Sequence, residues 1–174
     1  MDPIRTSRLW LRPLAARDAP ALFAIMSDAE TMRFWDWPAF TDPETVDEVV
    51  RAQIADTEAG SALYWAVALE ANGPAIGCCD LSEIDRHHGR AEVGFLFSRA
   101  TWGHGYALEA MTAIVDCAFG DLDLVRLWAR FHAGNERSRA LLERLGFAYE
   151  GTLRGHVWRD GVRRDCILYG RLGS

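Results

Sequence analysis

The chain has 174 residues, of which 49% are hydrophobic, 11% aromatic and 25% charged. Such a composition is typical of a globular protein rather than a disordered one, and the length suits one domain over residues 1–174. The 19 Lys and Arg residues against 25 Asp and Glu residues give a formal charge of −6, the wrong sign for a protein whose affinity comes from nucleic-acid or membrane phosphates.

The first residues and the cysteines indicate a compartment. Met1–Thr6 does not combine a basic segment with an apolar one, and no apolar run approaches the ~18 residues of a membrane span. The four cysteines include no CxxC pair, and the histidines form no HxxxH or HExxH motif. We therefore expect a cytoplasmic protein with reduced thiols and no metal centre.

Hydrophobic spacing predicts the first elements. Leu9–Pro13 is typical of a strand that ends at its proline, and apolar residues three and four apart over Ala15–Ser27 predict a helix. A second helix is predicted to begin at Thr41, acting as N-cap ahead of Pro43 and Glu44.

Three short strands are then predicted to form an antiparallel meander. They are expected over Leu63–Leu69, Ala75–Leu81 and Ala91–Phe97. Asn72-Gly73, between the first two, tolerates the positive φ of a hairpin turn.

After the meander, helices alternate with strands. Helices are predicted over Gly105–Phe119 and Asn135–Leu145, and strands over Leu124–Phe131 and from Phe147 onward. Asp160-Gly161 indicates a closing hairpin of undetermined loop length. The predicted fold is α/β (α+β), with a central, mostly antiparallel mixed sheet flanked by helices.

The segment most informative about chemistry is Trp102-Gly103-His104-Gly105-Tyr106-Ala107, which leads from the third meander strand into a helix. Its glycines let the backbone approach a ligand, and the first N–H groups of a helix are unpaired. Such a turn can bind an anion, although a tight turn without a ligand has the same pattern. The P-loop and GxGxxG motifs do not fit this segment.

Together with Asn135-x-x-Ser138 and Leu145-Gly146-Phe147, this segment resembles the two signature motifs of the GNAT superfamily of acetyl-CoA-dependent N-acetyltransferases. Thr6–Arg12 and Asp165–Tyr169 are similar to the branch that contains the ribosomal-protein-alanine acetyltransferases. The resemblance covers nearly the whole chain. It implies direct transfer of an acetyl group from acetyl-CoA to a primary amine, with a protein N-terminal α-amino group as the expected acceptor.

The resemblance also implies a cofactor site between two splayed parallel strands, Ala91–Phe97 and Leu124–Phe131. Pantetheine amides would pair with the backbone of the first strand, and the pyrophosphate would accept hydrogen bonds from the glycine turn. The cofactor-binding residues implied are Phe95, Phe97, Trp102, Gly103, His104, Gly105, Tyr106, Ala107, Asn135 and Ser138. Asn135 is also a good helix cap, so a structural role is its alternative.

Glu92 is the candidate general base, because an amine is mostly protonated near neutral pH and must lose a proton before it attacks a thioester. Strand alternation puts Glu92 on the face opposite Phe95 and Phe97 unless a bulge intervenes. An ion pair with an arginine at the sheet surface is the structural alternative. Asp80 and Glu83 are weaker candidates for the base.

The sequence departs from the family pattern at two positions. Leu142 stands where many members carry a tyrosine that reprotonates the departing thiolate, so Ser138 becomes the substitute donor, although a CoA thiol is acidic enough to leave as thiolate. Trp102 stands where many members have Arg or Gln, which removes one possible phosphate partner.

Trp35, Trp37 and Trp158 are the expected aromatic residues of the acceptor site, with core packing as the alternative. Two other functions remain open. The acceptor could be a small amine such as a polyamine, an amino acid or an antibiotic, or the chain could be a catalytically idle acetyl-CoA-binding module. Members of the resembling branch are monomers or homodimers.

Overall fold

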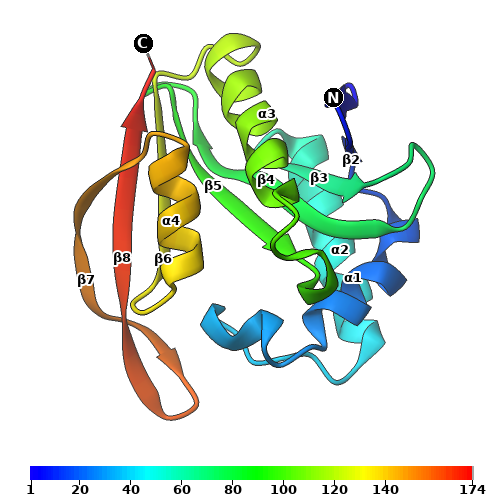
Figure 1. The fold of residues 1–174 in the computed structure, drawn as a ribbon, viewed down its shortest axis with the longest axis horizontal. Coiled ribbons are helices and arrows are strands. Elements are labelled where there is room, and N and C mark those ends of the chain that lie inside the picture. Colours follow the sequence, from blue (N-terminus) through cyan, green and yellow to red (C-terminus); the bar gives the residue numbers. More distant parts are fainter. Residues whose placement is uncertain (174) are drawn as a thin grey trace.

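The computed structural model describes residues 1–173, whose strands pair in the order β1-β2-β3-β4-β5-β6-β8-β7 (Figure 1). The strands are β1 (Ile4–Arg5), β2 (Trp10–Pro13), β3 (Leu63–Ala68), β4 (Ala75–Asp85), β5 (Arg90–Phe97), β6 (Arg126–His132), β7 (Ala148–Arg159) and β8 (Val162–Leu172). The helices are α1 (Ala19–Met26), α2 (Pro43–Ala59), α3 (Tyr106–Gly120) and α4 (Glu136–Arg144), with 3-10 turns η1 (Ala16–Asp18), η2 (Thr31–Phe34) and η3 (Arg99–Thr101). The α/β prediction of a mostly antiparallel mixed sheet is confirmed.

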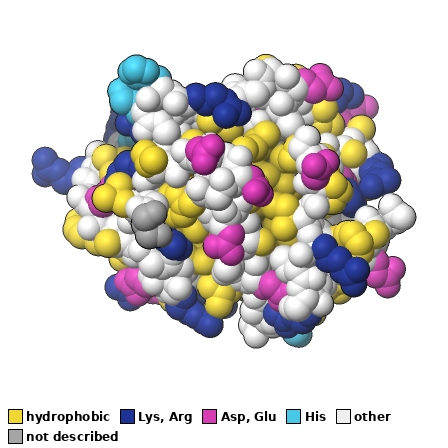
Figure 2. Space-filling view, turned by 90° about the horizontal axis from the view of Figure 1, so that it is seen from above, with side chains coloured by type: hydrophobic (Ala, Val, Ile, Leu, Met, Phe, Trp, Pro, Cys, Tyr) yellow, Lys and Arg dark blue, Asp and Glu magenta, His cyan; other side chains and the backbone are white. Residues whose placement is uncertain are grey.

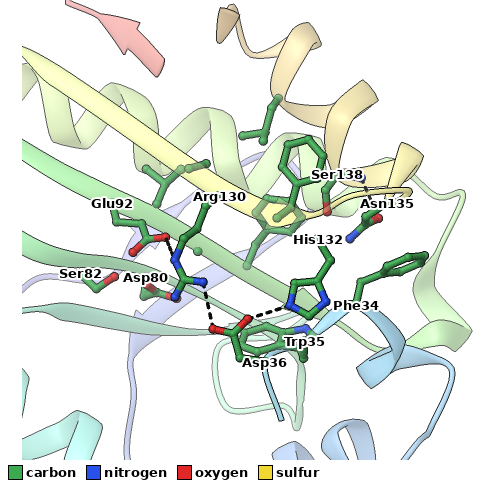
Figure 3. A pocket seen from close by; sticks show the side chains of 16 residues that line it. Phe34, Trp35, Asp36, Asp80, Ser82, Glu92, Arg130, His132, Asn135 and Ser138 are labelled. Carbon is green, nitrogen blue, oxygen red and sulfur yellow. Dashed lines mark hydrogen bonds and ion pairs between the residues drawn. The ribbon is translucent and has the colours of Figure 1, made fainter. Parts of the chain in front are cut away.

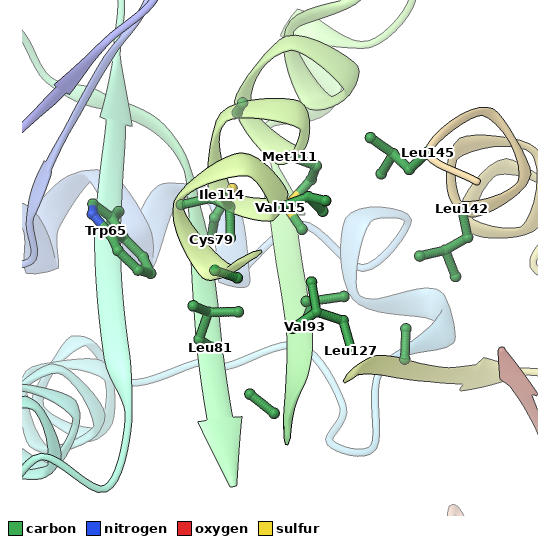
Figure 4. Close-up of a cluster of buried hydrophobic side chains, with 14 of the residues drawn as sticks. Trp65, Cys79, Leu81, Val93, Met111, Ile114, Val115, Leu127, Leu142 and Leu145 are labelled. Atoms are coloured by element: carbon green, nitrogen blue, oxygen red, sulfur yellow. The ribbon is translucent and has the colours of Figure 1, made fainter. Parts of the chain in front are cut away.

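Helices cover both faces of the sheet, and each face has its own core. Val93 of β5 and Leu127 of β6 pack beneath α3, whose Met111 and Ile114 are fully buried (Figure 4). Leu96, on the opposite side of β5, belongs to the second core beneath α1 and α2. The period of two along β5 therefore divides its side chains between two cores.

The parallel strands β5 and β6 pair over a short stretch and then separate. Their register joins Arg90–Glu92 to Arg126–Trp128 only. Beyond this point β5 stays paired with β4 as far as Phe97, while β6 stays paired with β8 as far as His132. The two strands thus splay apart within a continuous sheet, as the family resemblance implies.

Two predicted hairpin turns differ in backbone conformation. Asp160 and Gly161 have φ values of 53° and 75° and form the two-residue loop between β7 and β8, which confirms the predicted hairpin and fixes its length. The hairpin predicted at Asn72-Gly73 is confirmed, because β3 and β4 pair antiparallel on either side of it, but the positive φ that the dipeptide tolerates is not used. That turn is closed by a 3.1 Å hydrogen bond from the Gly73 N–H to the Glu70 carbonyl, and neither Asn72 nor Gly73 has positive φ.

Two helix starts also differ from expectation. The N-cap of α2 is Asp42 rather than Thr41, because the Asp42 side chain accepts from the Glu44 N–H at 3.0 Å and Pro43 occupies the first helical position. The predicted helix from Ala15 divides into η1 and then α1.

The surface carries charges of both signs. On the face shown in Figure 2, acidic and basic side chains are interspersed around apolar atoms rather than gathered into a patch of one sign. No helix within residues 1–173 is both long enough and apolar enough to cross a membrane.

Candidate active site

The splay between β5 and β6 opens a cavity of about 220 Å³ (Figure 3). Its polar lining consists of Asp36, Asp80, Ser82, Glu92, Arg130, His132, Asn135 and Ser138. Its larger apolar lining residues are Phe34, Trp35, Val93, Phe95, Phe131 and Leu142. Residues from both halves of the chain therefore meet where the sheet divides.

The cavity has two chemically different sides. The β4–β5 register runs without a shift from Phe97 to Glu92, so Glu92 and Phe95 point to opposite faces of the sheet. Asn135 and Ser138, at the start of α4, lie apart from Glu92 across the cavity (Figure 3). The alternation predicted from the sequence thus holds, without the bulge that would bring Glu92 beside Phe95.

Four charged or ionisable side chains form a chain of contacts on the Glu92 side. Arg130 Nε lies 3.5 Å from Glu92 Oε1, and Arg130 Nη1 donates to Asp36 Oδ2 at 3.0 Å. His132 Nε2 lies 2.9 Å from Asp36 Oδ1 (Figure 3). The other ring nitrogen of His132, Nδ1, is buried without a hydrogen-bond partner in residues 1–173. The ion pair expected as the structural alternative for Glu92 is therefore present.

Burial shifts the acidity of two carboxyl groups that line the cavity. It raises the pKa of Glu92 to about 7, against the opposing effect of Arg130, and nearby carboxylates raise it further. Burial also raises the pKa of Asp80 to about 6. Asp36 differs, because its hydrogen bond with His132 lowers its pKa. Glu83, the other weak candidate, is exposed at a bulge with φ of 49°.

The glycine turn has the backbone that an anion site requires. Gly103 and Gly105 have φ values of 81° and 78°, which favour glycine, and Gly105 is the N-cap of α3. No side chain caps this helix start, so its first N–H groups remain free of a capping acceptor within the described chain.

Trp102 forms a hydrogen bond with β5 and a cation–π contact with Arg137. Its Nε1 donates to the Phe97 carbonyl at 3.0 Å, which means that this carbonyl already has one partner. The Arg137 guanidinium lies 4.1 Å from the centre of the Trp102 ring. Sequence reasoning missed Arg137, because the contact joins α4 to the glycine turn and no local pattern reveals it.

Arg8 approaches the same turn from the N-terminal segment. Its Nη1 donates to the His104 carbonyl at 3.0 Å, and its guanidinium lies 4.7 Å from the centre of the Tyr106 ring. Glu109 of α3 holds Arg8 through a 2.6 Å contact with its Nε. The segment that carries the branch resemblance therefore supports the glycine turn.

Asn135 is the predicted helix cap, and its contact with the cofactor stays a prediction. Its Oδ1 accepts from the Ser138 N–H at 3.2 Å as the N-cap of α4, and both residues line the cavity. Leu142 also lines the cavity but is only 1% exposed, so its side chain mostly belongs to the core.

Of the three expected tryptophans, only Trp35 lines this cavity. Trp37 is 55% exposed and Trp158 is 64% exposed, and both lie outside this lining, so their contact with the acceptor stays a prediction. Their exposure has a local cause: Asp36 turns inward to Arg130, and on β7 the buried residue is Val157, so its neighbour Trp158 faces outward.

Arg159 fastens the Trp35 segment to the β7–β8 hairpin. Its Nη1 donates to the carbonyls of Met32, Arg33 and Trp35 at 2.8, 3.1 and 2.6 Å. Sequence reasoning missed both Arg159 and Asp36, whose partners lie far away in the chain. Within residues 1–173, no group of three or more His, Cys, Asp or Glu side chains could hold a metal ion.

Comparison with known proteins identifies the family. The model of the acetyltransferase (GNAT) domain matches residues 8–148. The uncharacterized N-acetyltransferase p20 of Bacillus licheniformis is 31% identical over 172 residues, covering 99% of this chain and 97% of that protein. The spermidine N(1)-acetyltransferase of Escherichia coli K12 is 28% identical, covering 90% and 82% of the two chains.

A solved structure shares the fold. RimL, a ribosomal L7/L12 alpha-N-protein acetyltransferase in complex with coenzyme A, superposes with a TM-score of 0.89 at 21% identity, covering 98% of this chain and 97% of RimL. The family resemblance found in the sequence is therefore confirmed, and the chain belongs to the GNAT acetyltransferase domain family as an acetyl-CoA-dependent N-acetyltransferase.

Proposed function

We propose that this enzyme acetylates the N-terminal α-amino group of a protein or peptide, with Glu92 as general base. The observation that carries the proposal is a partly buried carboxylate that lines the cavity with a pKa raised to about 7. A base with this pKa can both accept and release a proton near neutral pH. Because Glu92 and Phe95 face opposite sides of the sheet, the amine would approach Glu92 from the side away from the cofactor.

The proposed cofactor arrangement keeps the residues expected from the sequence. The pantetheine arm would pair with the backbone at Phe95 and Phe97 and pass Asn135. The pyrophosphate would accept hydrogen bonds from the turn over Gly103–Ala107. The positive φ values and the uncapped start of α3 support this arrangement. Arg137 supplies a positive charge beside Trp102, at the position where the motif lacks its usual Arg or Gln.

In the proposed reaction the acceptor arrives as an ammonium ion and loses one proton to the Glu92 carboxylate. The nitrogen lone pair then attacks the thioester carbonyl carbon, a C–N bond forms and the C–S bond breaks. Ser138, which lines the cavity, donates a proton to the departing thiolate and regains one that the nitrogen releases through solvent. The products are the amide, the CoA thiol and protonated Glu92. Proximity in the splayed cleft supplies much of the rate.

Two observations bear on the acceptor. The similarity of Thr6–Arg12 and Asp165–Tyr169 to the ribosomal-protein branch favours an N-terminal α-amino group. The spermidine N(1)-acetyltransferase relative makes a polyamine the second candidate acceptor. Both acceptors are cations near neutral pH, so the acidic lining suits either.

The deciding experiment measures thiol release from acetyl-CoA with alanine- and serine-initiated peptides, spermidine, free amino acids and aminoglycosides. The proposal expects kcat/KM to be highest for the peptides, with mass spectrometry placing one acetyl group on the α-amino nitrogen. Turnover of spermidine with no turnover of any peptide would replace the proposed acceptor with a polyamine.

A further inference from the structure

The Asp80 carboxylate lies directly over the backbone of β5. Asp80 of β4 pairs with Gly94 of β5, and a Cβ atom at Gly94 would stand 2.3 Å from Asp80 Oδ1. That distance is far below any van der Waals contact, so a side chain at position 94 would displace the carboxylate. The missing side chain of Gly94 therefore makes the space that Asp80 occupies in the cavity lining.

Asp80 has no ion-pair partner among the residues that the structure describes, although it is surrounded by ionisable groups. Ser82 of β4, Glu92 of β5 and Arg130 of β6 line the cavity with Asp80, Ser82 forms a hydrogen bond with it, and Tyr64 and Cys78 are further ionisable groups near it. The single arginine among them contacts Glu92 and Asp36 instead (Figure 3). Asp80 is partly buried, and a carboxylate that is partly removed from water without a cation beside it is a candidate for a functional role.

The cavity thus has an excess of negative charge on one side. Asp36 contacts Arg130 and His132, and Glu92 contacts the same Arg130. Asp80 has no cationic side chain paired with it in the described residues. The alternating register places Asp80 and Glu92 on the same face of neighbouring strands, two register positions apart, because Asp80 pairs with Gly94 and Glu92 with Ser82. An acceptor amine brings the cation that this arrangement lacks.

We propose that Asp80 binds the protonated amine of the acceptor and holds it beside Glu92, so that the enzyme selects cationic primary amines over neutral ones. This inference rests on the proposed function and adds a specificity-determining residue to it. Asp80 holds the ammonium ion, and Glu92 then takes its proton. Gly94 is required because only glycine leaves room for the carboxylate in this position.

The test compares wild type with Asp80→Asn. The acceptor is whichever amine the wild type turns over. A neutral analogue of that acceptor, in which a hydroxyl replaces the amine, serves as a competitive inhibitor. An alanine-initiated tetrapeptide and its lactoyl counterpart are the first pair. Asp80→Asn is expected to raise the acceptor KM at least tenfold. The inhibition constant of the neutral analogue and the Kd for acetyl-CoA should change less than twofold. Glu70→Gln, which changes an exposed carboxylate in the turn before β4 and outside the cavity lining, is the matched control and should behave as wild type.

Gly94→Ala provides an independent variant, because its Cβ displaces the carboxylate without changing any charge; it should also raise the acceptor KM if it folds as judged by circular dichroism. An equal loss of affinity for the ammonium acceptor and the neutral analogue in Asp80→Asn would show a structural role and overturn the proposal. An unchanged acceptor KM would overturn it too. Turnover of spermidine but not of peptides would overturn only the proposal that the acceptor is an α-amino group. The role of Asp80 would then be tested with spermidine as the acceptor.

Discussion

Arg130 approaches Glu92 less closely than it approaches Asp36: its Nε lies 3.5 Å from Glu92 Oε1, whereas its Nη1 lies 3.0 Å from Asp36 Oδ2. The Glu92 carboxylate is therefore paired weakly enough for burial to raise its pKa to about 7. This balance gives the cavity a group that can exchange a proton at neutral pH, and it makes stability as well as activity depend on that proton.

Glu92→Gln should change the pH dependence of stability. Since burial raises the folded-state pKa of Glu92 from 4.5 to about 7, the folded protein binds this proton more tightly than the unfolded chain does. Wild-type stability should therefore fall as pH rises from 4.5 to 7 through this group. Glutamine stays neutral, so the Tm of the variant minus that of wild type should increase from pH 5 to pH 8 in thermal unfolding. A difference independent of pH would contradict the raised pKa.

Gly105→Asp should weaken acetyl-CoA binding at least tenfold in titration calorimetry, because it introduces a side chain and a negative charge at the glycine turn. Gly60→Asp is the matched control. Gly60 has nearly the same φ, +76° against +78° for Gly105, and nothing lies within 4 Å of its Cβ position. Both variants should lose similar stability, and equal Kd values for acetyl-CoA in the two folded variants would place the pyrophosphate elsewhere.

Arg137→Gln should raise the Kd for acetyl-CoA by about tenfold, the size of one charge-assisted hydrogen bond. The reason is that the Arg137 guanidinium lies over the Trp102 ring, beside the glycine turn. The effect should shrink at high salt, because exposed charges are screened. Arg144→Gln, in the last turn of the same helix, should leave the Kd unchanged. If both variants bound acetyl-CoA as wild type does, Arg137 would have no role in phosphate binding.

Ser138→Ala should lower kcat by roughly tenfold while leaving the Kd for acetyl-CoA unchanged, because the variant removes the proposed proton donor. The helix cap should survive, since Asn135 accepts from the backbone N–H of residue 138, which alanine retains. Steady-state thiol release over pH 6–9 measures the effect. Wild-type kcat throughout that range would remove Ser138 from the mechanism.

Features with a local cause could be predicted from the sequence. The Asp160-Gly161 turn and the two glycines before α3 follow from the positive φ that these positions require. The start of α2 shows the limit of local reasoning. Thr41 and Asp42 can both cap a helix. The helix begins at Pro43, so the residue directly before it, Asp42, is the N-cap.

The site was predictable only in part, because its contacts join distant segments. Asp36 meets Arg130 and His132 across 94 and 96 residues of chain, and no periodicity records such a pairing. The same holds for Arg137 against Trp102. Composition also cannot say which tryptophan lines the cavity: Trp35 does, whereas Trp37 and Trp158 are exposed outside the lining.

The central claim, that Glu92 deprotonates the acceptor, is tested most directly by the pH dependence of the rate of thiol release at saturating acetyl-CoA in wild type and Glu92→Gln. The account predicts a wild-type kcat/KM that rises with pH through an apparent pKa near 7, and a variant about 100-fold slower whose remaining rate rises with the amine's own pKa of ~8. A variant with the wild-type rate and the wild-type pH profile would contradict the claim.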